Sequence, residues 1–136
     1  MASPEIERLK EIYAAVHRQQ REQLARLVAH DMEFEMPKGL PWGGVHHGQD
    51  GMAAVAEIHR EHVEGEWAEP EEFIEADGER IVALGRTRGR ARKSGATFEV
   101  PFAHVWGFAE GSPYRFRGYF DTAPILTALN APAGDG

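Results

Sequence analysis

The sequence contains no cysteine, and this absence removes several kinds of chemistry at once. Disulfide bonds, thiolate metal sites and cysteine nucleophiles are all excluded. Positive charge is also scarce, because 15 lysine and arginine residues stand against 22 aspartate and glutamate residues, for a formal net charge of −7. We therefore expect no nucleic-acid partner and no attraction to an anionic membrane, since both need a basic surface.

Long apolar runs are missing as well. No run approaches the roughly 20 residues that cross a bilayer, and the first residues form a polar helical pattern and not an export signal. We therefore expect a cytoplasmic protein. The 136 residues are 42% hydrophobic, which is typical of one globular domain. We assign residues 1–130 to a single domain and expect residues 131–136 to form a disordered tail.

The spacing of apolar residues predicts helices first and strands later. Ser3 caps a first helix, a second short helix contains Leu24 and Val28, and a third covers residues 49–64. Alternation predicts a strand at residues 32–36 and an irregular Pro- and Gly-rich loop at residues 37–48. Four strands in an antiparallel meander and a short C-terminal helix follow. This order favours an α+β fold with helices covering one face of a curved antiparallel sheet.

The last two strands hold the best candidates for chemistry. Paired positions in a hairpin sum to about twice the position of the turn centre, so His104 lies roughly opposite Gly118 or Tyr119, and Phe102 lies near Asp121. This register predicts that a histidine, a tyrosine and an aspartate share one apolar, aromatic-rich surface. Asp121 also stands where the cap of the last helix is expected, which gives it a purely structural alternative role.

Two other groups of polar residues have a functional and a structural interpretation. Arginines at alternate positions from Arg86 to Arg92 form a stripe on one strand face. The stripe is either an anion site or, as we favour, a solvated face paired with the acidic strand before it. His46 and His47 lie in the irregular loop, where solvated imidazoles are favoured over a pocket cover.

A metal site is not expected. His59 and His62 lie three residues apart on the predicted third helix, but the spacing is not that of an HExxH motif and no third ligand is evident. A solvated pair, or one at the edge of the apolar stripe, is the favoured interpretation.

Four segments give the chain a family likeness: PKGLPWGGVHHGQDGM, RIVALGRTRGRARKSG, VPFAHVWGF and YRFRGYFDTAPIL. With the order of the elements, they resemble the SnoaL-like branch of the NTF2-like superfamily over about Pro4 to Leu129. The resemblance implies a cone-shaped α+β barrel with N-terminal helices over the concave face of its sheet, a homodimer and an apolar cavity. Similar proteins include polyketide cyclases, ketosteroid isomerases and limonene-epoxide hydrolases.

The resemblance carries over to a few residues only. Asp121 matches the general acid/base of the cyclases, His104 resembles a histidine often found beside it, and Tyr13 is similar in placement to the oxyanion donor of the isomerases. Here Met36 precedes Pro37 where the isomerases have their base, and Arg86-Thr87-Arg88 lacks the first carboxylate of the epoxide hydrolases.

The function expected from these residues is acid–base cyclisation or isomerisation of an apolar carbonyl compound, without a cofactor. Asp121 and His104 are the expected catalytic residues. The residues expected to bind the substrate are mostly aromatic: Tyr13, Phe34, Met36, Trp42, Phe102, Trp106 and Tyr119. A non-catalytic ligand-binding or dimerisation module is the alternative, and epoxide hydrolysis is a further one.

Overall fold

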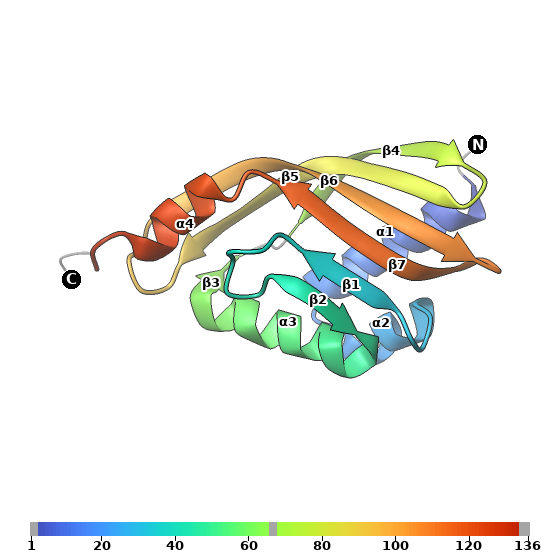
Figure 1. The fold of residues 1–136 in the computed structure, drawn as a ribbon, viewed down its shortest axis with the longest axis horizontal. Helices are drawn as coiled ribbons and strands as arrows, with labels where there is room; N and C mark the ends of the chain where they lie inside the picture. The colour runs from blue at the N-terminus through green and yellow to red at the C-terminus, as the bar shows by residue number, and fades with distance from the viewer. Residues whose placement is uncertain (1–2, 66–67, 134–136) are drawn as a thin grey trace.

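The computed structural model describes residues 3–65 and 68–133. Its elements in chain order are α1 (Pro4–His17), α2 (Arg21–Leu27), β1 (Glu33–Met36), β2 (Gly44–His47), α3 (Gly48–His62), β3 (Val63–Glu64), β4 (Glu69–Asp77), β5 (Arg80–Ala91), β6 (Thr97–Ala109), β7 (Ser112–Phe120) and α4 (Ala123–Asn130) (Figure 1). The order of helices and strands confirms the α+β prediction.

One curved sheet carries the fold. Its strand order is β2-β1-β7-β6-β5-β3, and β4 also pairs with β5. The predicted meander is confirmed, since β4, β5, β6 and β7 each pair antiparallel with the next strand. The sheet is nevertheless mixed and not wholly antiparallel, because β1 runs parallel to β7.

Charge pairs lie beside this parallel contact. Glu33 is in register with Arg115 and Glu35 with Arg117, and the two ion pairs measure 3.3 and 3.1 Å.

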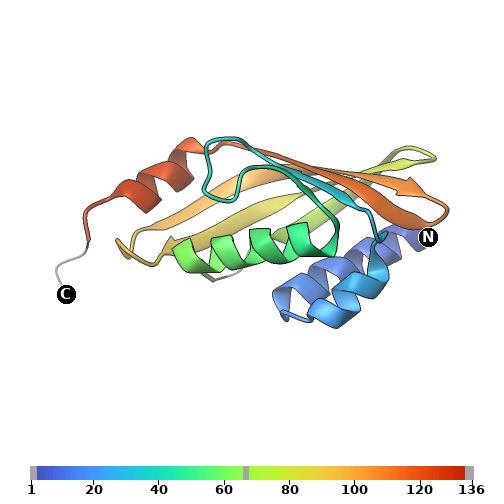
Figure 2. The same ribbon diagram turned by 60° about the horizontal axis from the view of Figure 1, so that its bottom comes forward.

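The three N-terminal helices lie on one side of the sheet. Figure 2 shows α1, α2 and α3 beneath the curved strands, and α4 at the far end of the sheet. Helix α1 begins as expected, because the Ser3 hydroxyl accepts a hydrogen bond from the Ile6 amide at 3.2 Å and Pro4 needs no donor in the first turn. The buried residues of α1 include Leu9, Ile12 and Tyr13, which face the sheet.

Two short strands and the end of the chain differ from the sequence predictions. The segment predicted to be irregular contains β2, which pairs with β1, and β3 continues directly from α3. Neither strand has enough residues to show an alternating pattern. Thr122 occupies the N-cap position of α4 without a side-chain hydrogen bond, and the carboxylate of Asp121 just before it accepts a hydrogen bond from the Ala123 amide. Of the predicted tail, residues 134–136 lie outside the described residues.

The arginine stripe is a solvated face, as favoured from the sequence. Arg88 pairs with Glu69 at 3.2 Å across the predicted hairpin, and Arg86 pairs with Glu99 of the next strand at 2.7 Å. The side chains in these pairs are about half exposed, so each pair is worth about 0–1 kcal/mol.

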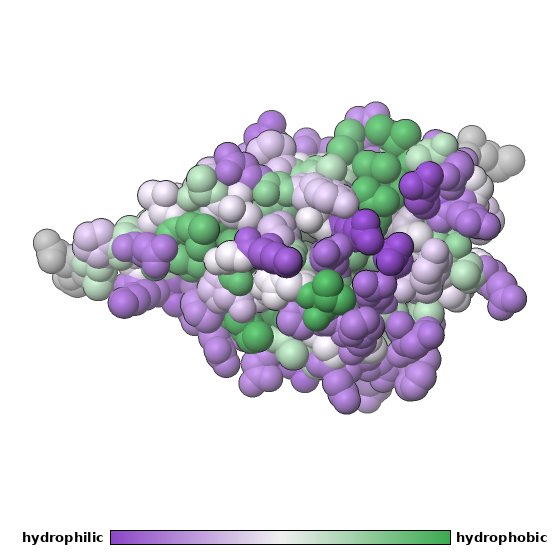
Figure 3. Space-filling model, in the orientation of Figure 1, coloured by the Kyte–Doolittle hydropathy of each residue, from purple (hydrophilic) through white to green (hydrophobic). Residues whose placement is uncertain are grey.

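Figure 3 shows one face of the molecule, mainly hydrophilic with separate apolar patches. No helix of the described ranges is long and apolar enough to cross a membrane.

The register of β6 and β7 decides which side chains face the helices. His104 pairs with Gly118 and Trp106 with Phe116, while Tyr119 pairs with Ala103. Partners across antiparallel strands point to the same face of the sheet. His104 and Trp106 therefore share the inner face with Phe116, and Tyr119 lies on the outer face.

Candidate functional site

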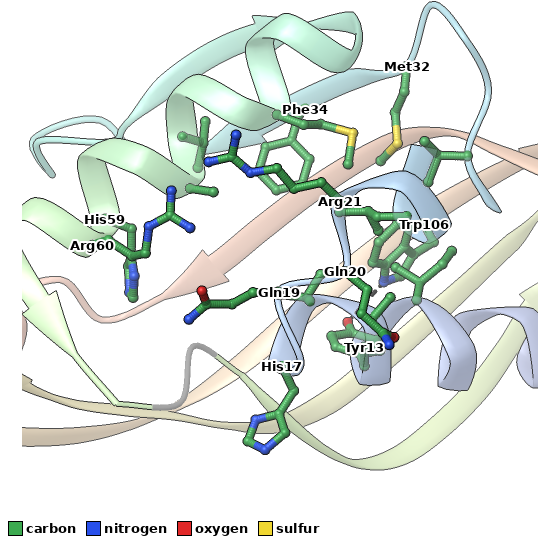
Figure 4. Close-up of a pocket in the computed structure, with 18 of the residues that line it drawn as sticks. Tyr13, His17, Gln19, Gln20, Arg21, Met32, Phe34, His59, Arg60 and Trp106 are labelled. Carbon is green, nitrogen blue, oxygen red and sulfur yellow. Dashed lines mark hydrogen bonds between the residues drawn. The ribbon is translucent and has the colours of Figure 1, made fainter. Parts of the chain in front are cut away.

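A cavity of about 380 Å³ lies between the N-terminal helices and the inner face of the sheet. Its walls are mainly apolar and include Ile12, Leu24, Met32, Phe34 and Val55. They come from α1, α2, β1 and α3, so the cavity exists only where these elements meet (Figure 4). A volume of this size and an apolar lining are typical of sites for small organic molecules.

A hydrogen-bonded cluster of Tyr13, His104 and Trp106 lies at the inner end of this cavity. The Tyr13 hydroxyl lies 2.6 Å from Nδ1 of His104 and accepts a hydrogen bond from the Trp106 indole N–H at 3.0 Å. Tyr13 and Trp106 line the cavity, whereas His104 is 1% exposed and lies behind Tyr13. Tyr13 and Trp106 are therefore the members of the cluster that border the space a ligand would fill.

Burial keeps the cluster uncharged at neutral pH. Desolvation lowers the pKa of His104 to about 3 and raises the pKa of Tyr13 above its ordinary value, with a smaller opposing effect from the Trp106 hydrogen bond. Phe102 stacks on the imidazole at a centroid distance of 3.8 Å, which helps to exclude water. The neutral cluster can donate or accept a hydrogen bond, but it holds no fixed charge.

His59 is a second imidazole at the cavity, and the sequence did not place it there. It is 7% exposed, lines the cavity from α3 and packs edge-on against Trp42 at 4.8 Å. Burial, followed by the charge of Arg60, lowers its pKa to about 4. Its position on the apolar stripe of the predicted helix, with Val55 and Val63, was the signal that could have identified it.

The ionisable side chains that the described residues contribute to the cavity lining are Tyr13 and several basic groups, and none is a carboxylate. Arg21 of α2 and Arg60 of α3 contribute to its lining, as does His17 at the end of α1. No aspartate or glutamate from the described part of the chain is among the lining residues. Figure 4 shows the Arg21 and Arg60 side chains reaching toward the same part of the cavity, with Tyr13 and Trp106 on the other side.

The prediction that Asp121 lies in an apolar cavity is wrong. Its side chain is exposed, and its carboxylate accepts a hydrogen bond from the Ala123 amide at 3.0 Å. Tyr119 is 53% exposed and does not line the cavity. Tyr119 shares the outer face of β7 with Arg115 and Arg117, because His104 on the inner face pairs with Gly118.

The other expected substrate-binding residues are divided between two places. Tyr13, Phe34 and Trp106 line the large cavity, as predicted. Met36 and Trp42 are buried and border a separate space of about 10 Å³ beside His104, which has room for about one water molecule. Phe102 lines neither space. The large cavity is instead formed mostly by helix residues, including Arg21 and Arg60, which no local motif marks.

The loop histidines do not join the site. Both lie in β2, where His47 is exposed and Nε2 of His46 lies 3.1 Å from the carbonyl oxygen of Gly43 just before the strand. Within residues 3–65 and 68–133, no three His, Cys, Asp or Glu side chains are arranged to hold a metal ion.

Comparison with solved structures gives close matches over nearly the whole chain. An NTF2-like protein of unknown function from Burkholderia pseudomallei is 34% identical, with a TM-score of 0.86, and the match covers 96% of this chain and 100% of that one. An NTF2-like protein from Burkholderia xenovorans is 30% identical, with a TM-score of 0.83 and coverage of 93% and 96%. TerC, co-crystallised with polyporic acid, is 27% identical, with a TM-score of 0.86 and coverage of 95% and 100%.

None of the functionally curated proteins matches the sequence. The family model of the SnoaL-like domain matches residues 9–116, a range that begins inside α1 and contains the cavity walls and the hairpin up to Phe116. The fold, the family model and the solved structures agree, and the chain therefore belongs to the SnoaL-like family of the NTF2-like superfamily.

Proposed function

We propose that the protein binds a small, mainly apolar carbonyl compound in the large cavity and moves a proton on it, as cyclisation and double-bond isomerisation require. The observation that carries the proposal is the Tyr13 hydroxyl, which lies at the inner end of an apolar cavity between Trp106 and His104. TerC, a relative at 27% identity, has been crystallised with an organic ligand, which supports the small-molecule part of the proposal.

Tyr13 acts in this proposal as the donor to the carbonyl oxygen. In the tautomer of His104 that carries its proton on Nδ1, the imidazole and the Trp106 indole both donate to the Tyr13 oxygen. The phenolic proton then points to the ligand, and the two donors stabilise the negative charge that the tyrosine oxygen gains as an enolate forms. A preorganised donor of this kind contributes about a hundredfold to a thousandfold in rate.

His59 acts in this proposal as the proton acceptor, the role that the sequence assigned to Asp121. It lines the same cavity and, with a pKa of about 4, is unprotonated at neutral pH. An unprotonated imidazole can accept a proton from the carbon next to a carbonyl group, although a base with so low a pKa is weaker than one tuned near neutrality.

A non-catalytic ligand-binding module is the second candidate. It is favoured by the lack of any carboxylate among the described lining residues and by the exposed position of Asp121.

We also propose that the protein forms a homodimer, because Tyr119 and Tyr114 expose aromatic surface on the sheet. Sedimentation velocity measures the mass of the protein in solution and tests this proposal.

An assay with a simple ketone distinguishes the enzyme from the non-catalytic binding module. α-Tetralone is an apolar ketone with exchangeable protons beside its carbonyl group, and its exchange in heavy water is followed by NMR. We expect the protein to bind it and accelerate exchange, and we expect Tyr13→Phe to lower that acceleration about a hundredfold or more. Binding without acceleration establishes the module and removes the enzyme.

A cavity-blocking variant shows where the ketone binds. Ala56 lies on the solvent-facing edge of the cavity, so Ala56→Trp fills the space without disturbing the core. Ala54→Trp is the matched control, because Ala54 is exposed on the same helix and does not line the cavity. Equal binding by both variants places the ligand elsewhere and overturns the proposed function.

A further inference from the structure

We infer that the natural ligand of the cavity is an anion: an apolar body with a carboxylate or an acidic enol at one end, held by Arg21 and Arg60. This inference rests on the proposed function, since it names the substrate class of the same cavity. It starts from the two guanidinium groups, which come from different helices and both border the space that the ligand would fill.

The two arginines differ from most others in the chain, because no carboxylate of the described residues pairs with either of them. Arg86 and Arg88 pair with glutamates on the outer face, and Arg115 pairs with Glu33. Within the described ranges, no such pair forms for Arg21 or Arg60. A cation beside an apolar cavity whose described lining residues include no carboxylate is complementary to an anionic ligand.

The acidic neighbours of Arg60 do not neutralise it. Glu64 lies one turn further along the chain, but its carboxylate pairs with Arg90 and Arg92 at 3.8 and 3.4 Å. Glu57, one turn before Arg60, is exposed and does not line the cavity. The pairing of Glu64 elsewhere leaves the Arg60 guanidinium available to a ligand.

The overall charge of the protein does not itself attract an anionic ligand. With a net charge of −7, the protein repels small anions at long range, and that repulsion is screened beyond about 8 Å at physiological salt. Anion binding must therefore come from short-range contacts.

The geometry also orients the ligand: Figure 4 places the arginines on one side of the cavity and Tyr13 on the other. The acidic group lies at the arginines, and the apolar body extends toward the carbonyl contact at Tyr13.

The test compares two ligands that differ only in charge, β-naphthoate and β-naphthamide, by calorimetry at neutral pH and low salt. We expect wild-type protein to bind the anion about tenfold or more tightly than the amide. Arg21→Gln and Arg60→Gln should each weaken naphthoate binding about three- to tenfold and leave the amide unchanged. Circular dichroism confirms that the variants fold.

Arg18→Gln is the matched control. Arg18 is exposed, has no ion pair among the described residues and does not line the cavity, so this variant changes the net charge equally and should bind both ligands as wild type does. If Arg21→Gln and Arg60→Gln leave the preference for the anion intact, or if Arg18→Gln lowers it as much as they do, the inference is overturned.

Failure of the inference and failure of the proposed function give different results. If both naphthyl compounds bind equally well and Ala56→Trp blocks both, the cavity is a ligand site but not one for anions. If neither compound binds at high concentration, or if Ala56→Trp blocks neither, the proposed function itself is contradicted.

Discussion

The Tyr13 hydroxyl and Nδ1 of His104 lie 2.6 Å apart although 91 positions separate them in the chain. Tyr13 comes from the first helix and His104 from the middle of β6, so this contact exists only after the helix packs on the sheet. Both groups are buried and uncharged at neutral pH, and the Trp106 indole completes the cluster. The contact joins the floor of the cavity to the core of the sheet.

Replacing Tyr13 by phenylalanine removes one oxygen atom and leaves the ring in place. The Trp106 N–H then lacks its acceptor and His104 loses a partner, so we expect the free energy of unfolding to fall by about 1–3 kcal/mol. Urea unfolding measures the change. Tyr114→Phe is the control, because Tyr114 is 41% exposed and its variant should unfold as wild type does. Equal stability of the two variants would show that the buried hydroxyl contributes nothing.

Stability should fall as the pH drops from about 6.5 towards 4.5. The unfolded chain protonates its histidines near pH 6.5, whereas burial holds the pKa of His104 at about 3 and that of His59 at about 4 in the folded protein. Because the unfolded state binds more protons in this window, each imidazole removes about 1.4 kcal/mol of stability per pH unit. At pH 5 the expected loss is about 2 kcal/mol for each group.

Unfolding in urea at a series of pH values measures this slope. His59→Gln should remove about half of it, while His47→Gln, at an exposed position, should leave it unchanged. A stability that stays constant between pH 6.5 and 4.5 would mean that neither imidazole is held neutral by the fold.

Asp121→Asn should leave ligand binding and proton exchange unchanged. The carboxylate is exposed and accepts a hydrogen bond from the Ala123 amide, and an asparagine oxygen can accept the same bond. We expect a loss of stability below about 1 kcal/mol. Calorimetric titration and NMR exchange measure the two activities. A large loss of exchange in a folded variant would return Asp121 to the catalytic role that the sequence suggested.

Gly85→Ala should destabilise the sheet. A Cβ atom at this position would lie 2.1 Å from the carbonyl oxygen of Glu69 and 2.8 Å from the Cα atom of Pro70, and these backbone atoms cannot move without shifting β4. We expect a loss of about 2–4 kcal/mol, measured by thermal unfolding. Gly78→Ala is the matched control, because nothing lies within 4 Å of its Cβ position. Similar unfolding of both variants would contradict the close approach of β4 and β5.

The amino-acid sequence by itself determined the class of fold and the order of the helices and longer strands, but not the short strands β2 and β3. Apolar spacing placed the helices and strands, since an amphipathic helix and a half-buried strand impose different periods on the same residues. Alternation along the last strand and the residue after it also put Tyr119 and Asp121 on one face and Phe116 on the other. The pairing of the arginine stripe with neighbouring carboxylates followed from adjacency in a hairpin.

Only the tertiary structure decided which of those faces is the inner one and which residues form the cavity. The choice of face depends on the register of β6 against β7, where a shift of one residue exchanges the inner and outer sets. His104 opposite Gly118 put the histidine inside and Asp121 outside. The cavity brings together α1, α2, α3 and β1, and its key residues Tyr13, Arg21, His59 and Arg60 share no local pattern. Their proximity is a consequence of helix packing on a curved sheet, which local spacing along the chain does not encode.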